Sequence, residues 1–335
     1  MLLSDRLMPS SQIECHNSRM ILIKKRIALF LGKTSKYLGF ICRFTEALDT
    51  AIDAVWLVRS LVDEDPASYT PHLADQLSNL GTAFSKLNRH TESLGVDQIS
   101  VRLYRSLVAE NPGRYTPDLA CQLANLGADL SNLNRHTESL KVRQESVGLY
   151  RSLVAENPGP YTPDLARQLG NLGADLSDLN QHPESLKVCQ ESIGLYRSLV
   201  AENSASFTPD LARQLGNLGV GLSNLNQHTE SLTVHQESVS LYRSLVAENP
   251  ASYTPNLAFQ LGNLGIELSN LNRHAESLKV RQESVGLYRS LVVENPASYT
   301  PHLARRLHDL SIILWHMGRR AESQAASEES AMLSK

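Results

Sequence analysis

One histidine recurs at a fixed interval along most of the chain. The histidines are His90, His136, His182, His228 and His274, each 46 residues after the last. A row of histidines could ligate metal ions, but each one stands in the turn between two predicted helices. Packed helices lie about 8–10 Å apart, which is too far for neighbouring imidazoles to share an ion with ligands at about 2 Å. We therefore predict no metal site and no cofactor.

A threonine followed by a proline recurs with the same period. The threonines are Thr70, Thr116, Thr162, Thr208, Thr254 and Thr300. A threonine hydroxyl can cap the free backbone N–H groups at a helix start, and proline fits the first helical turn. Capping is sufficient to explain every pair, so we do not assign these threonines a role in phosphorylation. The pattern predicts a helix start at each Thr-Pro.

No set of residues predicts catalysis. The polar residues recur in every repeat, whereas a catalytic site requires a unique set, and the glycines lie inside predicted helices rather than in a phosphate-binding loop. The cysteines contain no Cys-x-x-Cys pair, which is typical of reduced intracellular thiols. They are Cys15, Cys42, Cys121 and Cys189. We expect a cytoplasmic protein that is not an enzyme.

The charge balance narrows the class of partner. The 335 residues are 41% hydrophobic and 20% charged, with a formal net charge of −3. Without a basic excess to neutralise phosphates, nucleic acid is not an expected partner. The apolar stretch 21–31 is interrupted by Lys24, Lys25 and Arg26, so it does not predict a membrane span. We expect a protein or peptide partner, and the oligomeric state stays open.

The repeat itself predicts a pair of helices. From Thr162 to about Leu179, leucines are spaced by three and four residues, as on one face of a helix. A second helix is expected from Pro183 to about Glu202, and the Asn-Pro that follows it in most repeats is a stop signal. We call these helix A and helix B. Pairs that repeat with a fixed period predict an all-α solenoid of antiparallel helix pairs.

The repeats define the domain organisation. Six helix pairs are expected from residues 70, 116, 162, 208, 254 and 300, the last of them short, polar and cap-like. One partial repeat precedes them from Arg43, so the array is predicted to cover residues 43–335. Residues 1–42 form a divergent leader with a degenerate first helix. Because this leader is basic and poor in acids, a mitochondrial presequence is an alternative for it.

Particular residues at this spacing resemble a known family. The run Leu169-x-x-Leu172-Gly173-x-x-Leu176, followed by Ser185 early in helix B, resembles the tetratricopeptide (TPR) repeat. The longer unit resembles kinesin light chains and arrays found in fungal proteins. The chain lacks the Trp or Tyr of helix A, has Ser where the family has Ala, and exceeds the usual 34 residues. HEAT and armadillo repeats match the period but lack the Leu-Gly spacing. The resemblance implies a right-handed superhelix whose concave groove, lined by helix A, holds peptides.

Comparison of the repeats with one another divides helix A into faces. The leucines form the predicted packing face. Beside it, Gly170 and Gly173 lie in a strip of small residues, which predicts a close helix approach. On the opposite side one column is Asn79, Asn125, Asn171, Asn217 and Asn263, with Asp309 in the last repeat. An asparagine amide can both donate to and accept from an extended backbone.

The columns beside these asparagines vary from repeat to repeat. One column is Asp75, Cys121, Arg167, Arg213, Phe259 and Arg305, and another is Lys86, Asn132, Asp178, Asn224, Asn270 and His316. A third is Thr82, Ala128, Ala174, Val220, Ile266 and Ile312. We predict that the asparagines contact a peptide main chain and that the varied residues select its side chains. The alternative is that these asparagines are solvated or bond a neighbouring helix.

The predicted function is a non-catalytic protein–protein interaction scaffold that binds a peptide or partner segment in the groove lined by helix A. A different class is also open. Fungal arrays that this chain resembles often adjoin a nucleotide-binding switch domain or a caspase-like protease domain, so the chain could be a regulatory fragment of a larger signalling protein. The near-identity of the middle repeats also fits a duplicated remnant with little function.

Overall fold

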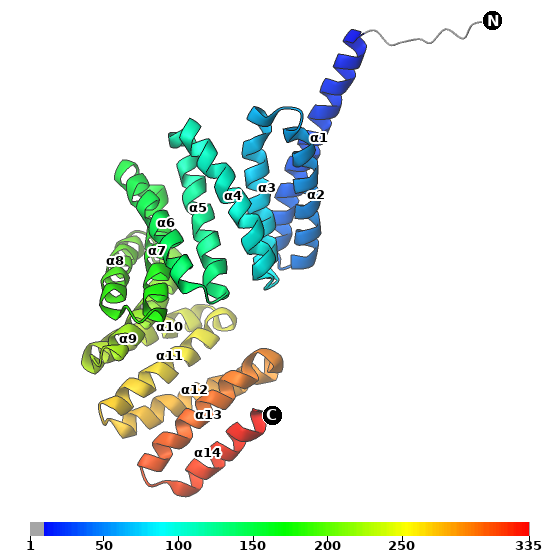
Figure 1. Ribbon diagram of the computed structural model, residues 1–335. Coiled ribbons are helices and arrows are strands. Elements are labelled where there is room, and N and C mark those ends of the chain that lie inside the picture. Colours follow the sequence, from blue (N-terminus) through cyan, green and yellow to red (C-terminus); the bar gives the residue numbers. More distant parts are fainter. Residues whose placement is uncertain (1–9, 335) are drawn as a thin grey trace, which may run out of the picture. The chain divides into compact units, whose positions relative to one another are not determined.

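The computed structural model describes residues 10–334, and their side chains from residue 20 onward. Within that range it contains fourteen α-helices and no strand (Figure 1). The first helices are α1 (Ser10–Phe40), α2 (Phe44–Val62), α3 (Pro66–Lys86), α4 (His90–Glu110), α5 (Pro112–Asn132), α6 (His136–Glu156) and α7 (Pro158–Asp178). The others are α8 (His182–Glu202), α9 (Ser204–Asn224), α10 (His228–Glu248), α11 (Pro250–Asn270), α12 (His274–Glu294), α13 (Pro296–His316) and α14 (Arg320–Leu333).

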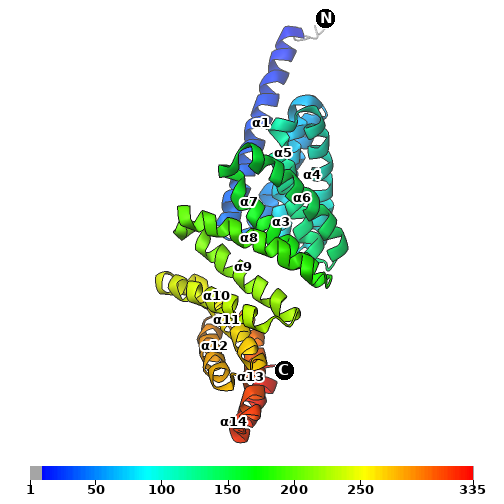
Figure 2. The ribbon, with the colours of Figure 1, turned by 90° about the vertical axis from the view of Figure 1, so that its left-hand side faces the viewer.

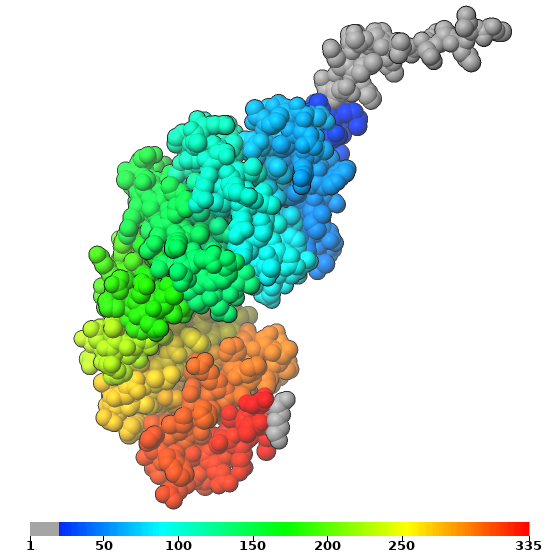
Figure 3. Space-filling view, viewed as in Figure 1, coloured from blue at the N-terminus to red at the C-terminus, as the bar shows by residue number. Residues whose placement is uncertain are grey.

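The chain forms two compact units, Met1–Tyr161 and Thr162–Lys335. Within each unit, consecutive helices pack against one another as antiparallel pairs (Figures 1 and 2). In Figure 3 side chains fill the spaces that the ribbon leaves between consecutive helices of a unit. The all-α class and the helix pairs are as predicted, whereas the handedness of a superhelix stays a prediction.

The leucine face of helix A forms the core. In the second unit, Leu257, Leu261 and Leu264 of α11 pack against Val239 and Tyr242 of α10. In the first unit, leucines of α5 pack in the same way against α4. This confirms the predicted packing face.

The strip of small residues lies where helices approach closely. A Cβ on Gly173 would meet the Cys189 sulfur of α8, and one on Gly170 would meet the Gln214 amide of α9. A larger side chain at either position would clash with these neighbours, so the predicted close approach is confirmed.

The turn from helix A to helix B has a fixed geometry. An asparagine with positive φ ends helix A in five repeats, at Asn88, Asn134, Asn180, Asn226 and Asn272, and Gly318 with φ 74° takes this place in the last. Asparagine and glycine tolerate the left-handed region best, which explains their use at this position.

Helix A begins four residues earlier than predicted. In α11 the N-cap is Asn249, whose side chain accepts a hydrogen bond from the Ser252 N–H at 3.2 Å, and Pro250 occupies the first turn. Thr254 lies inside the helix, where its hydroxyl donates to the Pro250 carbonyl at 2.7 Å. The prediction that threonine caps the helix was therefore wrong. Two possible helix starts compete in α11, and the earlier one allows a longer helix.

In α4, α6, α8, α10 and α12, two buried serines of helix B bond to helix A. Ser231 donates to the Gly219 carbonyl at 2.8 Å, and Ser238 donates to the Ala212 carbonyl at 2.7 Å. Similar bonds occur in both units. A hydroxyl at these positions adds a bond between helices that an alanine methyl cannot make.

The N-terminal helix α1 packs against α2 and α3 of the first unit. Its buried Ser35 donates to the Ala47 carbonyl at 2.7 Å, and a Cβ on Gly32 would meet the Gln76 amide. These contacts match the register of later repeats. Residues 1–9 of the predicted leader lie outside the described residues, and the domain boundary at residue 42 stays a prediction. No helix of the described range is long and apolar enough to cross a membrane.

Candidate functional site

The predicted binding residues lie on the exposed side of helix A, here called the helix-A face. It comprises the asparagine column and the three varied columns defined above. The residues at positions 86, 132, 178, 224, 270 and 316 are all exposed, and those of the asparagine column are half-buried except for the exposed Asn217. The packing face and the helix-A face are thus on different sides of the helix.

The asparagines differ in their hydrogen bonds. Asn79 donates to the Gln76 side chain of its own helix at 3.3 Å, and the buried amide nitrogen of Asn263 has no partner. Within the described part of the chain, no hydrogen bond is formed by the side chains of Asn125, Asn171 or Asn217. These three amides keep their capacity to donate and accept.

The last repeat departs from the asparagine column for an electrostatic reason. Asp309 accepts from the Arg306 guanidinium at 3.0 Å and lies 4.0 Å from that of Arg281. Both arginines are buried, and sister repeats have glutamine at the position of Arg306. A carboxylate at Asp309 neutralises these cations, so this residue has a structural role besides its predicted contact with a peptide.

The first varied column carries charged and aromatic residues. The Arg167 guanidinium pairs with Asp164, and Arg213 pairs with Asp210 at 3.0 Å, each within one helix. The Phe259 side chain is 42% exposed, with the Arg306 guanidinium 5.3 Å from its ring centre. Arg305 is exposed. The second unit therefore presents cationic and aromatic side chains along this column.

In the first unit the same column is acidic and polar. Asp75 accepts a hydrogen bond from the Tyr104 hydroxyl of α4 at 2.5 Å, and Cys121 is exposed. Burial, together with the nearby Asp75 carboxylate, raises the pKa of Tyr104 above its ordinary value. The hydroxyl therefore stays protonated and keeps Asp75 in place.

The last polar column adjoins the histidine row. His90 lies 3.1 Å from a carboxylate oxygen of Asp129 and 3.5 Å from the Asn132 amide. His228 makes the same approach to Glu267 at 3.0 Å and to Asn270 at 3.4 Å. Each histidine thus links the start of helix B to the end of the next helix A.

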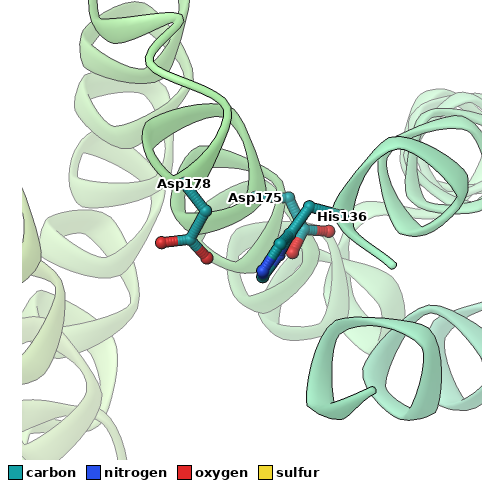
Figure 4. A group of neighbouring side chains, drawn as sticks. All are labelled: His136, Asp175 and Asp178. Atoms are coloured by element: carbon teal, nitrogen blue, oxygen red, sulfur yellow. The ribbon is translucent and has the colours of Figure 1, made fainter. Parts of the chain in front are cut away.

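Not every repeat has an acidic residue near the end of helix A to face the histidine. The acids lie three residues before the polar column, as Asp175 does before Asp178 on α7, where Asp175 is buried and Asp178 exposed (Figure 4). At the corresponding position α9 has Gly221 and α13 has Ile313. In the second unit the rings of His274 and His316 stack instead, with centres 6.2 Å apart. Asn224, at the end of α9, is exposed.

The sequence-based analysis missed a buried polar position in helix B. It is occupied by Asp97, Arg143, Cys189, His235 and Arg281, all nearly inaccessible to solvent. Each lies against the glycine strip of helix A. The signal was the variation of this column between charged and neutral residues, which an exposed helix position would also show.

Burial shifts the ionisation of this position. It raises the pKa of Asp97 to about 8, with the nearby Asp129 carboxylate adding to the effect. It lowers the pKa of His235, whereas the facing Glu267 opposes that shift. We call a helix B together with the two helices A that pack against it a joint. The charge of the buried position therefore differs from one joint to the next.

Two cavities open on the first unit. One, of about 440 Å³, is lined by Asp97, Asp129, His90, Asn125 and Asn132, among others. The other, of about 500 Å³, lies between α1, α2 and α3 and includes Phe40 and Phe44. The first cavity brings residues of the predicted helix-A face together with the buried carboxylates.

Comparison with known proteins agrees with the repeat structure. The family model described as tetratricopeptide repeat matches residues 165–205 and 211–251. No curated protein matches the chain closely enough to count as a relative. Solved structures of similar fold do exist.

Three solved structures resemble the chain in fold. The apo form of RapI is 10% identical, with a TM-score of 0.63, over 91% of this chain and 97% of that one. Aspartyl phosphate phosphatase F from Bacillus subtilis is 10% identical, with a TM-score of 0.59, over 100% and 77%. BtubC (BKLC) from P. vanneervenii is 14% identical, with a TM-score of 0.58, over 73% and 90%. At such low identity these likenesses show the fold alone.

The matched repeats lie in the middle of the array. The same helix pair, leucine face and glycine strip recur with the same period on both sides of them. The two matched segments are therefore tetratricopeptide repeats, and the repeats on both sides of them have the same helix-pair architecture.

Proposed function

We propose that the helix-A face binds an extended peptide or partner segment, and that the protein acts as a scaffold rather than as an enzyme. Tetratricopeptide repeats and this fold support a protein-interaction scaffold. The absence of a basic excess favours protein over nucleic-acid partners, and the cysteine pattern favours a cytoplasmic location.

One observation carries the proposal. The amides of Asn125, Asn171 and Asn217 recur at one position, half-buried in the first two and exposed in the third, yet among the described residues they bond to no other side chain or backbone. Repeated groups that can both donate and accept match the repeated N–H and C=O groups of an extended chain. The varied columns beside them supply the differences that specificity needs.

The test uses three substitutions within the second unit. The variant Asn171→Ala, Asn217→Ala, Asn263→Ala removes the asparagines of α7, α9 and α11. The control variant Gln190→Ala, Gln236→Ala, Gln282→Ala removes three exposed amides from helix B. Both variants and the wild type are used to recover partners from cell lysate, and circular dichroism checks that each is folded.

We expect the asparagine variant to lose a partner that the wild type and the glutamine control both retain. Equal recovery by all three proteins would show that the helix-A face is not the binding surface. Loss of the partner by both variants would show that binding does not depend specifically on the helix-A face, and would contradict the proposal.

A further inference from the structure

At the buried position of helix B in the second unit, a residue that can carry a charge has an opposite charge near it, and the remaining residue is neutral. In the second unit, Arg281 of α12 donates to Ser277 at 3.1 Å and lies 4.0 Å from Asp309 of α13. His235 of α10 faces Glu267 of α11, and Cys189 of α8 is a neutral thiol. A buried charge is costly unless an opposite charge lies near it.

The joint formed by α3, α4 and α5 breaks this rule. Here the position holds Asp97, and Asp129 of α5 lies near enough to repel its charge, so two carboxylates line one cavity. Each is only 1% exposed. Asp129 lies 3.1 Å from His90, but oxygen Oδ1 of Asp97 has no hydrogen-bond partner. Two buried acids with an unpartnered oxygen call for a cation or a proton.

The same joint contains space. Aspartate is much shorter than the arginine of sister repeats, and a cavity of about 440 Å³ is lined by Asp97, Asp129, Ser93 and His90. Asn125 and Asn132, which belong to the helix-A face, also line it, so the cavity opens on that face. The exposed Lys86 lines the cavity as well, but no ion pair joins it to either carboxylate within the described part of the chain.

We propose that this cavity receives the guanidinium group of an arginine side chain of a bound partner, between Asp97 and Asp129. The proposal rests on the proposed function and gives the peptide a chemistry. In a sister joint Arg281 shows that a guanidinium is accommodated beside the glycine strip, where it lies near Asp309 at the position of Asn125. A planar guanidinium presents five donors, which suits two carboxylates and the nearby side-chain amides better than a compact ammonium does.

The test measures binding of N-methylguanidinium by the full-length protein, through the shift of its melting temperature and by calorimetry. Tetramethylammonium at equal ionic strength is the control ligand, because it carries the charge without donors. Binding is measured above pH 8, where Asp97 is ionised. Asp97→Asn keeps the shape of the side chain and removes that charge. Asp49→Asn, on an exposed residue of α2, is the matched control variant. Asp97→Arg copies the sister repeats and provides an internal guanidinium.

We expect N-methylguanidinium to stabilise the wild type and Asp49→Asn, with an affinity at least about tenfold weaker in Asp97→Asn. Asp97→Arg should fold and show no binding. Equal effects of tetramethylammonium, unchanged binding in Asp97→Asn, or binding of Mg²⁺, Ca²⁺ or Zn²⁺ in place of N-methylguanidinium would each overturn the arginine pocket.

The two proposals fail in different ways. If N-methylguanidinium binds and the asparagine variant still recovers every partner, the pocket stands and the groove does not. If the asparagine variant loses a partner and N-methylguanidinium does not bind, the groove stands and the pocket is wrong.

Discussion

At the scale of single residues, close packing decides which positions of helix A tolerate change. The glycine strip lies against the buried column of helix B, whereas several glycines of helix B face open space. Glycine costs stability inside a helix, so it is useful only where a Cβ would clash. Replacing glycine by alanine should therefore lower the free energy of unfolding in the glycine strip of helix A and raise it at the open glycines of helix B.

We predict that Gly219→Ala destabilises the protein by about 1–3 kcal/mol, because its Cβ would lie 2.5 Å from the His235 ring. Gly286→Ala should stabilise it by about 0.5–1 kcal/mol, since no atom lies within 4 Å of the added Cβ. Urea unfolding of both variants measures the difference. A loss of stability in both would contradict the assignment of the strip.

The buried Asp97 predicts a dependence of stability on pH. It faces Gly81 of α3, His90 and Ser93 of its own helix, and Asp129 of α5. The pKa of Asp97 is about 8 in the folded protein, whereas its ordinary value is 3.8. Between these two pH values the folded state keeps a proton on Asp97 that the unfolded state has lost. The free energy of unfolding should therefore fall as the pH rises from about 4 to about 8.

Asp97→Asn should remove this contribution, because asparagine does not titrate. We expect the variant to be more stable than the wild type at pH 8, on the order of a few kcal/mol, and nearly equal to it at low pH. Urea melts at several pH values give the slope. Asp49→Asn serves as the control, and a slope that survives in Asp97→Asn would assign it to another group.

At the scale of helices, the start of helix A depends on a choice between two caps. The asparagine cap and its proline win over the later threonine and proline, although the second proline then removes one backbone donor from the second turn. The partly buried Tyr253, which precedes Thr254 in α11, packs against the core from the turn that the earlier start adds. Packing thus favours the longer helix.

We predict that Asn249→Ala costs about 1 kcal/mol, because the Ser252 N–H loses its acceptor. Thr254→Ala should cost less than about 0.5 kcal/mol, since its hydroxyl only adds a bond to a helical carbonyl. Thermal or urea unfolding distinguishes the two. A larger loss for Thr254→Ala would restore threonine as the cap.

At the scale of the whole molecule, nearly identical joints differ in their buried polar residues. The leucine core recurs with little change in both units, while the position of Asp97 holds an acid, arginines, a thiol or an imidazole. A repeat array behaves as a sum of units and nearest-neighbour interfaces. The core therefore supplies similar stability everywhere, and the polar residues make each joint distinct.

We predict that Leu123→Ala in α5 and Leu261→Ala in α11 each cost about 2–5 kcal/mol, because both leucines are fully buried. They belong to different clusters in different units, so the double variant should show the sum within about 0.5 kcal/mol. Hydrogen exchange should report each loss in its own unit. A strongly non-additive double variant would contradict independent joints.

The sequence by itself determined the repeat period, the helix pair, the leucine face and the glycine strip. These features depend on spacing along one helix, and Leu169, Leu172 and Gly173 carry that information locally. The exposed side of helix A followed from the same spacing. Its use as a binding surface stays a proposal.

Only the tertiary structure decided which polar residues meet. Asp97 and Asp129 belong to different helices, as do His228 and Glu267, and their contact depends on how those helices pack. The choice between Asn249 and Thr254 as the helix cap was decided in the same way. Local spacing fixes the face on which a side chain lies, whereas burial, partner and charge depend on the neighbour packed against that face.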